Sequence, residues 1–104
     1  MSKNFVQVLL PLALDEAFTY LAESDIETGD IVRVEFGKKQ IWGVVIAVDF
    51  NAPQKVAIEK IKKILEKNSR LKFSENHLKF IEAIASYNLA NRGLVLRAFM
   101  GILN

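Results

Sequence analysis

Hydrophobic and polar residues alternate over residues 30–49, on both sides of a short basic turn. One side of each arm is apolar, at Val32, Val34 and Phe36 and then at Trp42, Val44, Ile46 and Val48. A period of two is typical of half-buried strands. Between the arms, Gly37 allows a tight turn, and Lys38 and Lys39 follow it. The pattern predicts a β-hairpin with a glycine–lysine turn.

Two shorter segments before the hairpin are also β-prone. Phe5–Leu10 is apolar and stops at a proline, which predicts a strand. Over residues 15–21, Phe18 and Tyr20 share one side of an extended chain and Thr19 takes the other. A helical turn is the alternative there, because two acidic residues suit its first turn.

The second half of the chain carries helical signals. Residues 56–67 fit both helical spacing and a β-branched strand, so the pattern leaves both open. Ser74 is a good N-cap for an amphipathic helix that ends near Asn88. Residues 94–103 are apolar on nearly every side, so we expect this helix to dock on something outside the sequence.

These elements predict one α+β domain over residues 1–104. A β-rich body would occupy about 1–68 and a helical part 74–103. The apolar last segment suggests the N-terminal piece of a longer protein. The chain has no cysteine, no apolar run long enough to span a bilayer, and a poor match to a signal peptide. We therefore expect a cytoplasmic protein.

Charge is distributed unevenly along the chain. Residues 1–36 carry two basic and seven acidic side chains, a balance of −5, whereas residues 37–104 carry twelve basic and five acidic ones, a balance of +7. Such a separation indicates a basic face that could meet phosphate. Lysines that only keep the second half soluble are the plainer alternative.

The residues of common active sites are missing. His77 is the only histidine and is interpreted as an exposed helix residue, and no phosphate-binding loop or nucleophile elbow is present. Asp15 and Glu16 would point apart on an extended chain, which disfavours acid–base catalysis. We therefore predict a binding protein with no catalytic residue, no metal site and no cofactor of its own.

The residues that remain suit a nucleic-acid end. Such a ligand needs an aromatic ring to stack on a base, a hydrogen-bonding edge, and positive charge for phosphate. Phe18, Thr19 and Tyr20 can supply the first two. The charge would come from the turn at Gly37 and from the lysines Lys38, Lys39, Lys60, Lys62 and Lys63. The alternative is that both rings are ordinary core residues.

The order of several short motifs resembles one known family. These are Val8-Leu-Leu-Pro-Leu12, Phe18-Thr-Tyr-Leu21, Gly29-Asp-Ile-Val-Arg-Val-Glu-Phe-Gly-Lys38, Gly43-Val-Val-Ile46, Ile61-Lys-Lys-Ile-Leu65, and Ala85-Ser-Tyr87 followed by Gly93-Leu-Val-Leu96. In this order and spacing they resemble the N-terminal DNA-binding domain of PriA, the bacterial primosomal helicase that restarts stalled replication forks.

The resemblance implies a fold and a site. It implies a small β-barrel-like, OB-like body with a helical C-terminal part, and an extended chain around residues 60–65. It also implies a shallow pocket for the last base and 3′-hydroxyl of a nascent strand. Carried over to this sequence, the pocket would consist of Phe18, Thr19, Tyr20, Gly37 and Lys62. The two rings would form its wall, Gly37 would admit the sugar, and Lys62 would hold the end.

Two residues depart from the family pattern. Thr19 stands where family members often carry Asp, so a hydroxyl replaces an acceptor-only carboxylate and base contacts would weaken or pass to backbone groups. Lys63 stands where proline is usual and adds charge beside the pocket.

The family also implies partners beyond this chain. The ATP-driven helicase and a structural zinc site belong to other domains, so ATP and zinc are expected only there. DNA, the rest of the helicase and primosome proteins are the expected partners, near the nucleoid and away from membranes.

Two rival functions use different residues. A small protein-binding barrel would use Trp42 and Tyr20 as a peptide groove. A purely structural docking domain would use the apolar segment 94–103 as its interface.

Overall fold

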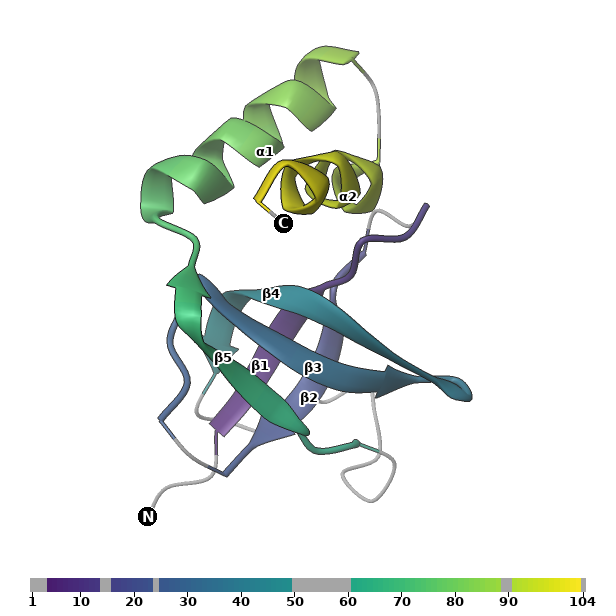
Figure 1. Ribbon diagram of the computed structural model, residues 1–104, viewed down its shortest axis with the longest axis vertical. Coiled ribbons are helices and arrows are strands. Elements are labelled where there is room, and N and C mark those ends of the chain that lie inside the picture. The colour runs from purple at the N-terminus through teal and green to yellow at the C-terminus, as the bar shows by residue number, and fades with distance from the viewer. Residues whose placement is uncertain (1–3, 14–15, 24, 50–60, 89–90, 104) are drawn as a thin grey trace.

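The computed structural model describes residues 4–13, 16–23, 25–49, 61–88 and 91–103, and these ranges form five strands followed by two helices. The strands are β1 (Asn4–Leu9), β2 (Phe18–Ala22), β3 (Asp30–Phe36), β4 (Lys39–Asp49) and β5 (Glu66–Lys72). The helices α1 (Glu75–Asn88) and α2 (Arg92–Leu103) lie together beyond one face of the sheet (Figure 1). The predicted α+β class is therefore confirmed.

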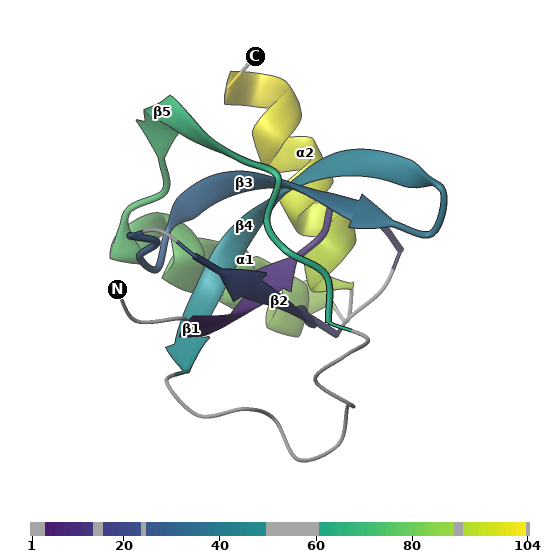
Figure 2. The same cartoon turned by 90° about the horizontal axis from the view of Figure 1, so that it is seen from below.

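The strands form one open antiparallel sheet in the order β2-β1-β4-β3-β5. The expected barrel-like, OB-like body is not found, because the sheet does not close. The stretch before β5 approaches β2 only at Leu21, through a single parallel bridge to Lys63 (Figure 2). The Ile64 N–H bonds to the Leu21 carbonyl. The N–H of the next residue, Leu65, bonds instead to the Arg33 carbonyl at 2.9 Å. The chain thus leaves the β2 edge for β3 before a ladder forms.

The predicted hairpin is confirmed as β3 and β4, which pair from Ile31↔Val44 to Phe36↔Lys39. Its turn contains Gly37 at a positive φ of 64°, a conformation that suits glycine. Strand β4 also pairs with β1 and has a bulge there, so it lies in the middle of the sheet and is buried on both faces around Val44 and Val45.

In the described part of the chain, buried side chains form two hydrophobic clusters on opposite faces of the sheet. The first, here called the inner cluster, is Val6, Val8, Leu10, Tyr20, Ala22, Ile26, Val32, Val34 and Val45. The second, the helix-side cluster, joins the sheet to α1 and α2 and is Leu9, Ile31, Val44, Phe73, Ile81 and Leu96. Adjacent residues of one strand enter different clusters because side chains alternate along a strand.

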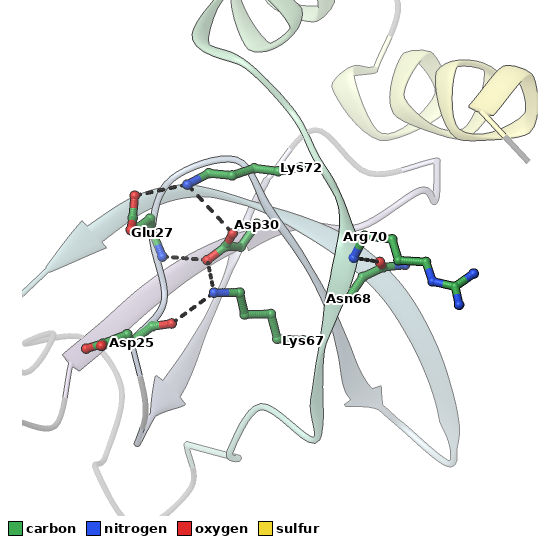
Figure 3. Close-up of polar contacts among 7 residues, drawn as sticks. All are labelled: Asp25, Glu27, Asp30, Lys67, Asn68, Arg70 and Lys72. Atoms are coloured by element: carbon green, nitrogen blue, oxygen red, sulfur yellow. Dashed lines mark hydrogen bonds and ion pairs between the residues drawn. The ribbon is translucent and has the colours of Figure 1, made fainter.

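Residues 61–65 are extended, as the resemblance implied for this segment; residues 56–60 lie outside the described ranges. Strand β5 was not predicted, since its sequence is polar on both sides. It is tied to the buried carboxylate of Asp30, which pairs with Lys67 at 3.5 Å and Lys72 at 3.9 Å (Figure 3). The hydrogen bond from Lys72 to Glu27, helped by the charges of Asp30 and Glu27, raises the pKa of Lys72.

Helix α1 begins as predicted, with Ser74 as its N-cap. The Ser74 hydroxyl accepts from the His77 N–H at 3.1 Å, and the His77 Nδ1 accepts from the Ser74 N–H at 3.1 Å. This reciprocal pair is a capping box in which a histidine replaces the usual Glu. In α2, Leu96 is fully buried against the sheet while Leu94 stays 40% exposed. Part of the apolar surface of 94–103 is therefore covered within the domain itself.

Replacement of Gly29 should harm folding more than replacement of Gly37, the other glycine with a positive φ. Its φ is 99°, and a Cβ there would overlap the Phe73 carbonyl oxygen. Its own N–H and C=O bond to Val45 and Phe73 at 2.7 and 2.8 Å, so the backbone cannot shift freely. We expect Gly29→Ala to lower the free energy of unfolding by at least about 2 kcal/mol in denaturant melts.

Gly37→Ala is the matched control for that prediction. Its φ of 64° is also positive, but nothing lies within 4 Å of the added Cβ. We expect a loss of about 1 kcal/mol from backbone strain alone. Equal losses in the two variants would show that the contact with Phe73 is unimportant.

Candidate nucleic-acid interface

A shallow cavity of about 230 Å³ lies where β2, the end of β3, the hairpin turn and residues 61–62 meet. Its lining residues are Phe18, Thr19, Tyr20, Glu35, Phe36, Gly37, Ile61 and Lys62. All five residues expected at a DNA-end pocket are among them. Segments far apart in the sequence have therefore been brought together at one place.

The two aromatic rings are not equivalent in this cavity. Tyr20 is only 4% exposed and belongs to the inner cluster. Phe18 is partly buried and meets Phe36 edge-to-face, with ring centroids 5.0 Å apart. The alternative that the rings are core residues therefore holds for Tyr20, and Phe18 is the ring that retains an exposed part.

The Tyr20 hydroxyl fixes the end of β3 to β2. It donates to the main-chain carbonyl of Glu35 at 2.8 Å. Burial, and next the negative charge of Glu35, raise the pKa of the Tyr20 phenol above its ordinary value of 10.0. The hydroxyl thus stays protonated and acts as a donor over the physiological range.

Thr19 presents its side chain and its main chain in different directions. Its hydroxyl accepts from the Gln7 Nε2 at 2.9 Å across the β1–β2 ladder. Strand alternation puts that side chain on the face opposite Phe18 and Tyr20. The Leu21 N–H and C=O point outward to the Lys62 carbonyl and the Ile64 N–H at 2.9 and 3.0 Å, and the Thr19 carbonyl points the same way.

The gap at this edge exposes main-chain polar groups. Continuing the ladder would need a bond from the Lys62 N–H to the Thr19 carbonyl, and the structure, which describes both residues, does not contain it. The Lys62 N–H and the Thr19 carbonyl thus do not bond to each other, and both residues line the cavity. Gly37 adds an accessible turn backbone, because nothing lies within 4 Å of the place where a Cβ would stand.

An ion pair lies beside the cavity. The Lys62 Nζ is 3.6 Å from the Glu35 Oε2, and the two side chains are 49% and 45% exposed. Both residues line the cavity, so a positive and a negative group sit at its edge together. Such half-exposed pairs contribute little to stability, which leaves them free to rearrange around a ligand.

The other lysines predicted to contact phosphate differ in whether they already form an ion pair. Lys38 and Lys39 are exposed beside Gly37 and form no ion pair with any residue that the structure describes. Lys63 pairs with Glu23 at 3.1 Å and is not a cavity residue. Lys60 lies outside the described ranges.

The fold pairs part of the charge that is separated along the sequence. Acidic groups of the first half pair with basic groups of the second, as in Glu35–Lys62, Glu23–Lys63, Asp30–Lys67 and Glu27–Lys72. The uneven charge thus reflects internal pairing in part. Among the described residues around the cavity, Lys38 and Lys39 at the hairpin turn are exposed and form no ion pair with a described residue.

Three cavity residues were not predicted as site residues: Glu35, Phe36 and Ile61. Phe36 follows the inward alternation of Val32 and Val34, so the pattern contained its signal. Ile61 carries no such signal, because its place depends on how the chain after β4 returns to the sheet. Glu35 lies in the predicted hairpin, but its contact with Lys62 depends on the same return of the chain.

The peptide groove of the rival hypothesis does not form. Tyr20 is in the inner cluster, whereas Trp42 packs against the helix-side cluster on the opposite face, with the Arg33 guanidinium 5.9 Å from its ring centroid.

No cluster of metal-binding side chains occurs among the described residues. Among the described helices, none has the length and apolar character needed to cross a membrane.

Titration of Tyr20 checks the environment of the cavity wall. The chain has two tyrosines, so a Tyr87→Phe variant leaves Tyr20 as the sole phenol. We expect its phenolate absorbance to rise with a midpoint above 10.0, because burial opposes the anion. A midpoint at or below 10.0 would contradict the buried, hydrogen-bonded position.

The raised pKa of Tyr20 also predicts how the free energy of unfolding changes at high pH. Unfolded Tyr20 loses its proton near 10.0 while folded Tyr20 keeps it, so the free energy of unfolding falls as pH rises through that window. Chemical melts from pH 9 upward should show this loss, and a Tyr20→Phe variant should show less of it. Identical pH dependence in the two proteins would contradict the assignment.

Comparison with known families places this cavity in context. A model of the PriA 3′DNA-binding domain (3′BD) matches residues 7–101, which is almost the whole chain and includes every described cavity residue. A search among curated proteins finds no match. On the strength of that match, the chain belongs to the 3′DNA-binding domain family of PriA.

Proposed function

We propose that this domain binds the 3′-hydroxyl end of a nascent DNA strand in the cavity between β2 and the hairpin turn, and so guides a restart helicase to stalled replication forks. The observation that carries the proposal is that Phe18, Thr19, Tyr20, Gly37 and Lys62 line one cavity. Its volume of about 230 Å³ suits a single terminal nucleotide better than a duplex. The domain itself is a binding module without a chemical step.

The terminal base would rest against Phe18. Base–aromatic stacking is worth about 1–3 kcal/mol and tolerates any base, since every base has a π-face. Tyr20 supports this ring from the core without stacking itself. The Thr19 carbonyl and the Lys62 N–H offer one acceptor and one donor to the base edge or sugar, which favours low base selectivity.

Phosphate recognition would rest on few charges. Lys62 lies at the cavity, while Lys38 and Lys39 extend from the turn beside Gly37. Gly37 lets the sugar approach the turn backbone. Two or three phosphate contacts give weak to moderate affinity with a clear salt dependence.

The match to the PriA 3′DNA-binding domain supports a proposal for the wider role. An end-binding module has its greatest use when joined to an ATP-driven helicase, since it then marks where unwinding should begin. The exposed Leu94 of α2 and Phe80 of α1 offer apolar surface for docking on the rest of such a helicase. Primosome proteins are further partners, and the site of action is the nucleoid in the bacterial cytoplasm.

End recognition is tested with matched oligonucleotides. We expect a fluorescent single strand that ends in a 3′-hydroxyl to bind more tightly than the same strand with a 3′-phosphate, by about tenfold or 1.4 kcal/mol. Anisotropy titrations at fixed salt measure both. Equal affinities for the two strands would contradict end recognition. If neither strand binds, the proposed DNA-binding role itself is wrong.

Two substitutions test the cavity residues. Phe18→Leu keeps an apolar residue in the core but removes the ring, so binding should weaken roughly five- to hundredfold, the loss of one stacked base. Lys62→Ala should weaken binding about tenfold, whereas Lys63→Ala should change it by less than about twofold. Lys63 is a matched control because it also pairs with a glutamate but lies outside the cavity.

A further inference from the structure

We propose that the Glu35 carboxylate is the group that makes the cavity prefer a hydroxyl end over a phosphorylated end. This inference rests on the proposed function and adds a residue that the expected pocket did not include. Among the described cavity residues, Glu35 is the sole carboxylate. Its carboxylate lies 3.6 Å from the ammonium of Lys62, another lining residue, so we expect a ligand at the described cavity to meet this negative charge.

The fold holds Glu35 in place from two sides. Its main-chain carbonyl accepts the Tyr20 hydroxyl at 2.8 Å, and its backbone pairs with Gln40 across the hairpin. Gly37 follows two residues later at the tight turn. The backbone of Glu35 is thus fixed at a strand end, and the carboxylate projects from that fixed point.

Lys62 completes the arrangement from the other side. Its Nζ lies 3.6 Å from the Glu35 Oε2, which is an ion-pair distance longer than an ideal hydrogen bond. The pair therefore presents one acceptor and one donor side by side. Both side chains are about half exposed, so a ligand can reach each of them.

A hydroxyl end and a phosphate end differ in how they fit such a pair. A 3′-hydroxyl can donate to the carboxylate and accept from the ammonium, so both charged groups stay satisfied. A terminal phosphate carries about −1.5 to −2 charges and has acceptor oxygens only. It would have to separate Lys62 from Glu35 and then lie beside an unpaired carboxylate, with like charges in contact.

A second ion pair, outside the cavity, makes it possible to test whether the cavity and not the pair alone carries the selectivity. Glu23 and Lys63 meet at 3.1 Å with exposures of 46% and 61%, close to those of Glu35 and Lys62. They are not among the residues that line the cavity. Glu23→Gln therefore removes the same charge from a similar pair and serves as the matched control.

The experiment compares hydroxyl-ended and phosphate-ended strands on the intact chain and on Glu35→Gln. We expect the preference for the hydroxyl end to fall about tenfold in Glu35→Gln, mainly because the phosphate end binds more tightly once Lys62 is released. Glu23→Gln should keep the original preference. An unchanged preference in Glu35→Gln, or an equal loss in Glu23→Gln, would overturn the role of Glu35.

Two further measurements separate charge from shape. Glu35→Asp keeps the charge, so it should retain most of the preference; a loss as large as in Glu35→Gln would overturn the electrostatic explanation. For the phosphate end, the salt dependence should steepen in Glu35→Gln by about 0.7 in log–log slope, one added phosphate contact on a single strand. An unchanged slope would show that Lys62 does not take up the phosphate.

The outcomes also separate this inference from the proposed function. If the unaltered chain binds neither end, DNA binding fails and the role of Glu35 falls with it. If it binds both ends equally, end recognition fails. If it prefers the hydroxyl end and Glu35→Gln does so to the same degree, the proposed function stands and only the inference is overturned.

Discussion

The buried carboxylate of Asp30 needs positive partners, and the strand that supplies them, β5, is paired with β3 and sets the path of the residues that reach the cavity. This carboxylate accepts the Glu27 N–H at 2.7 Å and pairs with Lys67 and Lys72 (Figure 3). A buried carboxylate without partners would be strongly unfavourable. Strand β5 has almost no apolar surface to bury, so these pairs help to decide where it lies. They thereby set the path of the preceding residues, which include Ile61 and Lys62.

The same pairing limits how the domain can attract DNA. Four lysines of the second half, Lys62, Lys63, Lys67 and Lys72, are already paired with carboxylates of the first half. Attraction at long range is therefore modest, and binding depends on what the cavity itself recognises. Such a module suits a tethered role, because attachment to a second DNA-binding unit raises its effective concentration at the end without requiring tight binding alone.

How much the sequence predicts depends on which force places each element. The hairpin and α1 follow from apolar periodicity and from the Ser74 cap, so local pattern sufficed. Strand β5 has no periodicity and is placed by long-range ion pairs, which single-sequence patterns do not reveal. Closure into a barrel was expected from resemblance and fails because the chain shifts from β2 to β3 after Ile64. Family motifs brought five residues to one cavity, but they did not include Glu35.

What each strand can offer to a ligand depends on where its side chains lie. The Thr19 hydroxyl is bonded to Gln7 on the opposite face, so this strand would meet a ligand at the cavity through its main chain. The Glu35 carboxylate comes from the end of β3 and lies 3.6 Å from the Lys62 ammonium. An anionic acceptor beside a cation is therefore supplied by β3 and residue 62, and not by the side chain of Thr19. Under the proposal, selectivity for a terminus depends on where this pair of charges sits.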